Sequence, residues 1–159
     1  MMPHDMTDLR GRLARFTGAV SADCIGFAIA RMFHDAGATV VLSSTTNRIF
    51  QRQNELDPER LRSLAVVADL THPEQAAELV EQVMERFGHI DILVNNASAI
   101  NLAGTESVSM KSYDLMHNIN VRGTFMLSQK CIPHLIKGDN SHILTLSPPL
   151  DIARKWFGM

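Results

Sequence analysis

The sequence has no apolar run near the length of about 18 residues that a membrane-spanning helix needs. Its first residues, Met1–Asp8, lack the apolar core of a signal peptide. Only two cysteines are present, Cys24 and Cys131, and they lie far apart in the chain. This scarcity argues against a disulfide framework and fits a reducing compartment. We therefore expect a soluble cytoplasmic protein with no membrane partner.

An excess of positive charge is also absent. The chain has 15 lysines and arginines against 17 aspartates and glutamates, a formal net charge of -2. Binding of nucleic acid driven by phosphate contacts is therefore not expected. The 7 histidines include no pair at metal-ligand spacing supported by a carboxylate, so we predict no metal site.

The 159 residues, 45% of them apolar, suffice for one domain with a substantial core. Short apolar runs alternate with longer segments of helical period, which is typical of a parallel α/β sheet. The predicted strands are Leu13–Thr17, Thr39–Ser43, Ser63–Ala68, Ile90–Val94 and His142–Leu146. The predicted helices are Ile25–His34, Arg48–Leu56, a helix from Thr71 to Phe87, and a long one, Lys111–Ile136, bent near Gly123 and Pro133. This βαβ order predicts a Rossmann-type doubly wound sheet, which binds ligands at the carboxyl ends of its strands.

The loop after the first strand runs from Thr17 to the helix that begins at Ile25. Glycine at such a turn lets backbone amides approach a pyrophosphate, and the helix N-terminus favours negative charge. Here Gly18 and Gly26 lie eight residues apart, and the usual G-x-G-x-x-G spacing is missing. Taken by itself, the loop fits a phosphate site and an ordinary turn equally well.

Four short motifs follow in order along the chain: Thr17-Gly18-Ala19, Asp69-Leu70, Asn95-Asn96-Ala97 and Asn120-Val121-Arg122-Gly123. Their order and spacing resemble the short-chain dehydrogenases/reductases, and the resemblance covers the chain from Leu9 onward. It implies a five-stranded sheet in the order 3-2-1-4-5, incomplete at its C-terminal edge. It also implies an NAD(P)-dependent oxidoreductase that transfers a hydride to or from an alcohol, carbonyl or enoyl substrate.

The resemblance assigns roles to individual residues. Gly18 and Gly26 would shape the pyrophosphate turn, Asp69 would accept a hydrogen bond from the adenine amino group, and Leu70 would flank the ring. Asn120 resembles the helix asparagine that supports the proton relay. The spacing from Gly18 to Cys24 looks like the enoyl-reductase-like branch of the family. The implied cofactor-binding residues are Gly18, Ala19, Cys24, Ile25, Gly26, Ser44, Thr45, Arg48, Asp69, Leu70, Asn95, Asn96 and Ala97.

The residues after the second strand distinguish between the two nicotinamide cofactors. An acid there would bind the 2′-hydroxyl of NAD, whereas this chain offers hydroxyls from Ser43 to Thr46, followed by Arg48. Hydroxyls and an arginine suit a 2′-phosphate, so NADP is favoured over NAD. The alternative for Arg48 is a solvated residue in the first turn of the next helix.

The proton donor expected of the family is missing from the sequence. In relatives a tyrosine donates the proton, with a lysine four residues later lowering its pKa. The single tyrosine, Tyr113, precedes Asn120 and has His117 four residues later. Ser147 is one position early for the substrate-binding serine, and Pro148 stands in its place. Ser147 and Asn120 are the remaining catalytic candidates, and the segment from Ser147 resembles the hydroxysteroid-dehydrogenase-like branch.

These observations leave two hypotheses. The chain is either the cofactor-binding portion of an oxidoreductase for a small-molecule substrate, inactive alone, or a non-catalytic nucleotide-binding or scaffold protein. We expect a flexible N-terminus over residues 1–8 and one dinucleotide-binding domain over 9–159, truncated after the fifth strand. The open strand edge favours a homo-oligomer. Arg15, in the middle of the first strand, requires a partner or an exit to solvent.

Overall fold

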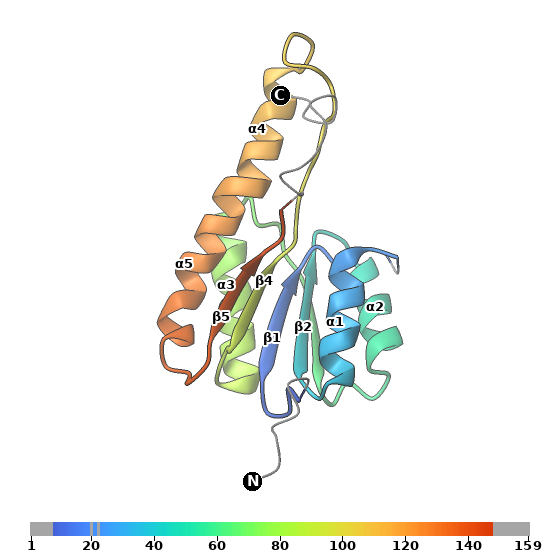
Figure 1. Cartoon of the computed structure of the whole chain (residues 1–159), viewed down its shortest axis with the longest axis vertical. Coiled ribbons are helices and arrows are strands. Elements are labelled where there is room, and N and C mark those ends of the chain that lie inside the picture. The colour runs from blue at the N-terminus through green and yellow to red at the C-terminus, as the bar shows by residue number, and fades with distance from the viewer. Residues whose placement is uncertain (1–7, 20, 22, 148–159) are drawn as a thin grey trace.

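The computed structural model describes residues 8–19, 21 and 23–147, which form one five-stranded parallel sheet with helices on both faces (Figure 1). The strands stand in the order β3-β2-β1-β4-β5, so the predicted fold class and strand order are confirmed. The strands are β1 (Leu13–Thr17), β2 (Thr39–Ser44), β3 (Ser63–Val67), β4 (Ile92–Asn95) and β5 (His142–Thr145). The helices are α1 (Ile25–Asp35), α2 (Arg48–Leu56), α3 (Pro73–Phe87), α4 (Met110–His117) and α5 (Thr124–Leu135).

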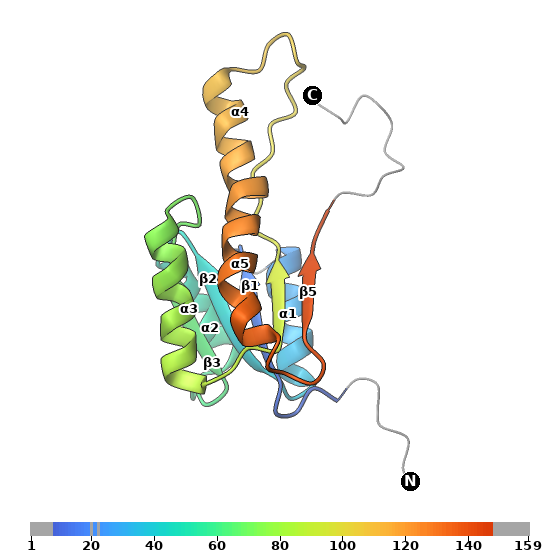
Figure 2. The ribbon, with the colours of Figure 1, turned by 90° about the vertical axis from the view of Figure 1, so that its left-hand side faces the viewer.

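The strands alternate their side chains between two hydrophobic cores. Ala14 and Phe16 of β1 face α1 and pack with its Phe27 in one buried cluster. Leu13 faces the opposite way and packs with residues of α3 and α5, among them Leu127. In Figures 1 and 2, α1 and α2 cover one face of the sheet and α3 and α5 the other. Both faces of the central strands are thus covered, which is why β1 and β2 are mostly apolar rather than alternating between apolar and polar residues.

Arg15 lies in the centre of β1 and is fully buried, so the expected exit to solvent does not exist. None of its three guanidinium nitrogens has a hydrogen-bond partner of normal geometry in the described part of the chain. Burial lowers the pKa of Arg15, and the neighbouring thiol of Cys131 on α5 acts in the opposite direction. The side chain therefore places a poorly compensated positive charge inside an otherwise apolar core.

The predicted helix Lys111–Ile136 is divided in the structure. Between α4 and α5 lies a π-helical segment, Asn118–Gly123, and Pro133 lies within α5. The Asn120 side chain pairs with the backbone of Ala99, donating to its carbonyl and accepting from its N–H, both at 2.8 Å. A Cβ on Gly123 would lie 3.2 Å from the carbonyl oxygen of Leu70. The segment thus lies against two loops of the sheet, a long-range contact that helical periodicity does not reveal.

Two other boundaries differ from the predictions. Strand β4 begins at Ile92 rather than Ile90, because the Asp91 carboxylate binds the N–H of Leu13 at 2.8 Å just before the strand. Helix α3 begins at Pro73, with His72 as its N-cap residue, rather than at Thr71. The remaining boundaries agree with the predictions within about two residues.

The fifth strand is an edge. Among the described residues, β5 pairs with β4 alone, and all four residues of β5 are exposed. Figure 2 shows β5 at the side of the sheet, beside β4. Exposed apolar side chains lie on α5, on β5 and just after them: Phe125, Ile132, Ile136, Ile143, Leu144 and Leu146. None of the helices in the described ranges is both long and apolar enough to cross a bilayer.

Candidate functional site: a pocket at the carboxyl ends of the strands

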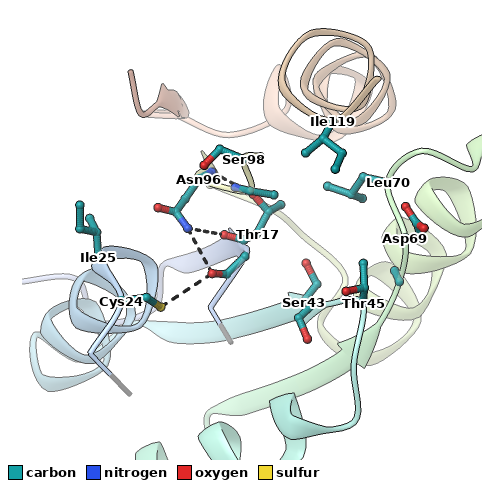
Figure 3. A pocket seen from close by; sticks show the side chains of 14 residues that line it. Thr17, Cys24, Ile25, Ser43, Thr45, Asp69, Leu70, Asn96, Ser98 and Ile119 are labelled. Atoms are coloured by element: carbon teal, nitrogen blue, oxygen red, sulfur yellow. Dashed lines mark hydrogen bonds between the residues drawn. The ribbon is translucent and has the colours of Figure 1, made fainter. Parts of the chain in front are cut away.

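A pocket of about 390 Å³ opens at the carboxyl ends of β1, β2 and β3, beside the start of α1 (Figure 3). This is where a doubly wound sheet binds its ligand. In Figure 3, Thr17, Cys24 and Asn96 lie on one side of the pocket and Thr45, Asp69 and Leu70 on the other. The lining residues are Thr17, Gly18, Cys24, Ile25, Ser43, Ser44, Thr45, Ala68, Asp69, Leu70, Asn96, Ala97, Ser98 and Ile119.

The loops after β1 and β4 are joined by side chain–backbone hydrogen bonds. The Thr17 hydroxyl accepts from the N–H groups of Asn96 at 2.9 Å and Ala97 at 2.8 Å. In return, Asn96 Nδ2 donates to the carbonyl oxygens of Thr17 at 2.9 Å and Gly18 at 3.3 Å. Asn96 therefore holds in place the start of the loop between β1 and α1, at Thr17 and Gly18. We call this loop the glycine loop.

Glycine is required at two positions because these loops approach so closely. Gly18 has φ +73°, and a Cβ there would lie 2.8 Å from Ala97 Cα. A Cβ on Gly26 would lie 2.4 Å from Asn96 Nδ2. The two glycines, eight residues apart, thus both contact Asn96, although Gly26 does not line the pocket.

Helix α1 begins at the pocket with Cys24 as its N-cap. The Cys24 thiol accepts from the N–H of Phe27 at 3.4 Å and donates to the carbonyl oxygen of Gly18 at 3.8 Å. The next residue, Ile25, is largely exposed and lines the pocket. Because first-turn N–H groups have no partners within the helix, this end attracts anions.

Asp69 follows β3 and lines the pocket on the side opposite α1. Its Oδ1 accepts from the N–H of Thr71 at 2.9 Å and from the Thr71 hydroxyl at 2.7 Å. Partial burial raises the pKa of Asp69, but the Thr71 hydrogen bonds and nearby His72 outweigh it, so the net pKa is lowered. The pocket therefore contains a carboxylate that stays ionised at neutral pH.

The residues after β2 lie at the same edge of the sheet. Ser44 Oγ donates to the Thr46 carbonyl at 3.0 Å, so its hydroxyl hydrogen is already engaged. Thr45 is exposed and lines the pocket, whereas Arg48 begins α2 and is exposed outside the lining. Ser44 and Thr45 therefore line the pocket, whereas Arg48, three residues after Thr45, does not.

Four other predicted site residues lie outside the lining. Ala19 is fully buried in the core. Asn95 is also buried, and its Nδ2 donates to Ser128 Oγ at 3.1 Å, which connects β4 to α5. Asn120 binds Ala99, and Ser147 is exposed after β5. Pro148 and the residues after it lie outside the described part of the chain.

Sequence reasoning left some lining residues out of the predicted site. Thr17, whose hydroxyl joins the two loops, stands directly before Gly18, and a polar residue at the end of a buried strand could have indicated it. Ser43, the residue before the last in β2, is likewise polar and buried, and its Oγ donates to the carbonyl of Phe16 at 3.1 Å. Ile119, by contrast, reaches the pocket from the π-helical segment, and no local pattern predicts that contact.

The sequence model of a family described as "Enoyl-(Acyl carrier protein) reductase" matches residues 18–149. The chain belongs to the short-chain dehydrogenase/reductase family. The predicted family is thereby confirmed, and the match extends over both the glycine loop and the π-helical segment.

Curated relatives and solved structures agree with this assignment. "Hydroxysteroid dehydrogenase-like protein 2" of Danio rerio is 45% identical over 141 residues, which cover 84% of this chain and 34% of the relative. The Bos taurus protein of the same name is 40% identical over 157 residues, which cover 94% of this chain and 37% of the relative. The chain thus spans about a third of the length of these relatives.

Among solved structures, a short-chain dehydrogenase of Mycobacterium thermoresistibile matches with a TM-score of 0.85 and 40% identity. The match covers 94% of this chain and 56% of that one. The "putative dehydrogenase" of Xanthomonas campestris matches with a TM-score of 0.82 and 37% identity. This match covers 95% of the present chain and 58% of the Xanthomonas campestris chain.

Proposed function

We propose that this chain forms the dinucleotide-binding part of an NAD(P)-dependent oxidoreductase. The observation that carries the proposal is the pocket itself. A glycine loop fixed by Asn96 lies at the start of α1, and the ionised carboxylate of Asp69 lies across from it. When bound, a nicotinamide cofactor supplies or accepts a hydride, here for an alcohol, carbonyl or enoyl substrate of the whole protein.

The residues of the chain bind the two ends of the adenosine diphosphate moiety by different means. At Gly18 and Gly26 a Cβ would collide with Asn96 or Ala97, so glycine at these positions lets the loops after β1 and β4 pack closely. The loop shaped in this way can act as a cradle whose backbone N–H groups bind a pyrophosphate at the start of α1. Asp69 accepts a hydrogen bond from the adenine amino group, and Leu70 with Ile119 provides apolar contact for the ring. The two ends of the moiety thus meet opposite charges. The pyrophosphate lies at the partly positive N-terminus of α1, and the adenine lies at the negatively charged Asp69.

NADP is the proposed cofactor. No acid follows β2 to bind a 2′-hydroxyl, and Thr45 is exposed toward the pocket, with Arg48 three residues later. An arginine binds a phosphate through several N–H groups, so Arg48 accounts for a preference for the 2′-phosphate.

Proton transfer in the whole protein is assigned to residues other than Tyr113. Tyr113 stacks on His117 within α4, with ring centroids 5.9 Å apart, and neither lines the pocket. Asn120 and Ser147 remain the candidates for a supporting role. We propose that the 159-residue chain binds the cofactor and does not turn over a carbonyl substrate.

Fluorescence titration with NADPH and NADH tests this function. The wild type should bind NADPH more tightly than NADH, Arg48→Gln should remove the preference, and Asp69→Ala should weaken binding of both. Arg60→Gln, an exposed arginine outside the pocket, serves as the matched control. Absence of binding by the folded wild type would refute the cofactor role and favour a scaffold protein.

We also propose that the chain forms a homo-oligomer in the cytoplasm. The support is the exposed edge β5 and the exposed apolar side chains of α5, which include Phe125 and Ile132. Sedimentation velocity should show a species of at least twice the chain mass, and Phe125→Lys should dissociate it. A wild type that sediments as a monomer at micromolar concentration would contradict the proposal.

A further inference from the structure

Three polar side chains form a short chain of contacts in the turn between β3 and α3. Thr71 Oγ1 lies 2.7 Å from Asp69 Oδ1 and 3.1 Å from His72 Nδ1. The backbone N–H of His72 donates to the backbone carbonyl oxygen of Asp69 at 3.1 Å, which closes the turn. The Asp69 N–H donates to Oε1 of Gln75 on α3 at 2.8 Å. The backbone on both sides of the contacts is therefore held in place.

The direction of these hydrogen bonds follows from counting hydrogens. A threonine hydroxyl carries one hydrogen, and an ionised carboxylate can only accept. The Thr71 hydrogen is therefore donated to Asp69, at the shorter of the two distances. The contact with His72 is then a hydrogen bond only if Nδ1 of His72 carries a hydrogen and donates it to Thr71 Oγ1.

His72 has no capping task that would explain this contact. It is the N-cap residue of α3, yet its side chain makes no capping hydrogen bond. Its imidazole is half exposed, and its nearest approach to the carboxylate is 3.6 Å, from Nδ1 to Asp69 Oδ2. In the described part of the chain, Asp69 Oδ2 accepts no hydrogen bond within normal distance.

We propose that His72 is a positioning residue for adenine recognition, acting through Thr71 on Asp69. Donation from Nδ1 orients the Thr71 hydroxyl toward Oδ1, and the fixed Oδ1 leaves Oδ2 to accept the amino group of adenine. The inference rests on the proposed cofactor role, and it adds a residue that positions the carboxylate on which selectivity for the base depends. A site that hydrogen-bonds an amino group discriminates strongly against an analogue lacking it.

Base selectivity distinguishes positioning from a merely structural role. The probes are NADP and its hypoxanthine analogue, in which a carbonyl oxygen replaces the adenine amino group and would face the carboxylate. The measured quantity is the ratio of the two dissociation constants. The wild type should favour the adenine form about tenfold or more, and Asp69→Ala should abolish this preference.

Two substitutions at His72 separate donation from bulk. His72→Leu removes the donor and should lower the preference for adenine about three- to tenfold, with little change in the affinity for the hypoxanthine form. In His72→Asn, the amide Nδ2 replaces the imidazole Nδ1 as donor, so selectivity should return to the wild-type value. His89→Leu is the matched control, because the His89 side chain has the same exposed fraction, 52%, and lies outside the pocket.

Each outcome decides between the two proposals. If the wild type binds neither dinucleotide, the cofactor role fails and this inference with it. If it binds both with equal affinity, or if His72→Leu retains full selectivity, the cofactor role stands and the inference about His72 is wrong. Failure of His72→Asn to restore selectivity would likewise overturn the donor role.

Discussion

The interior strands and the fifth strand differ in how they use their side chains. Every residue of β1 is buried, whereas every residue of β5 is exposed, although both belong to the same parallel sheet. Leu93 of β4 is fully buried, and its partner in register on β5, Ile143, is 43% exposed. The same kind of side chain therefore contributes to the core at one position and faces solvent one strand away.

This difference shows which part of the molecule positions the pocket. The lining comes from the ends of the buried strands β1, β2 and β3, from the start of α1, from the loop after β4 and from Ile119 of the π-helical segment. The exposed strand β5 contributes no residue to this lining. The contrast predicts a cofactor pocket that is insensitive to changes at β5.

The largest effect should come from the register pair Leu93 and Ile143. Leu93→Ala should lower the free energy of unfolding by about 2–5 kcal/mol, because it leaves a cavity in the core. In the monomeric chain, Ile143→Ala should lower it by less than about 1 kcal/mol, since the Ile143 side chain already contacts solvent there. Chemical denaturation of both variants measures the two values. Equal losses would show that β5 is buried in solution, for example by a second copy of the chain.

Arg15 is the exception within the buried strands, and its removal should make the contrast sharper. Arg15→Leu should raise the free energy of unfolding by about 1–4 kcal/mol, because an apolar side chain replaces a buried, poorly compensated charge. Thermal denaturation would measure the increase. A loss of stability in this variant would mean that the guanidinium contributes favourable contacts beyond Cys131.

Two glycines with nearly equal φ angles, one in the pocket and one outside it, allow backbone strain to be distinguished from an effect on the pocket. Gly88 has φ +78°, and a Cβ there would meet open space among the described residues, so Gly88→Ala should cost about 1 kcal/mol of backbone strain. Gly18→Ala adds a collision with Ala97 to a similar strain at φ +73°. It should be the more destabilising of the two and weaken NADPH binding at least about tenfold. Unchanged cofactor affinity in Gly18→Ala would contradict the cradle.

The smallest effect concerns pH and tests the packing of α1 against α2. Burial and the charge of Arg62 lower the pKa of His34, despite the opposing charges of Asp57 and Asp35. The pKa of His34 is lower in the folded state than in the unfolded state. Its contribution to the free energy of unfolding is therefore fully present above about pH 6.5 and is lost as the pH falls below that value. His34→Gln should flatten this decline between about pH 7 and pH 5, and the exposed His142→Gln should not. Denaturant titrations at several pH values provide the comparison.

The sequence was sufficient for the strand order and for the pocket around Gly18, Asp69 and Asn96, because these depend on local apolar runs and on loops at strand ends. It was insufficient for the π-helical segment, whose geometry depends on the distant contact between Asn120 and Ala99. It also placed Arg48 in the cofactor site; Arg48 lies in the first turn of α2 outside the pocket lining, so its contact with a 2′-phosphate stays a prediction. The burial of Arg15 is a third case, since a charged residue in a strand predicts a partner that the described part of the fold does not provide.

The Thr17 hydroxyl has a consequence for motion. Its two accepted hydrogen bonds connect the glycine loop to Asn96 and Ala97, and Asn120 connects Ala99 to the helix beyond. These hydrogen bonds and the backbone of residues 96–99 therefore connect Thr17, at the start of the glycine loop, to Asn120 of the π-helical segment. We expect a displacement of the glycine loop on cofactor binding to shift Asn120 as well, along contacts that do not involve the exposed strand β5.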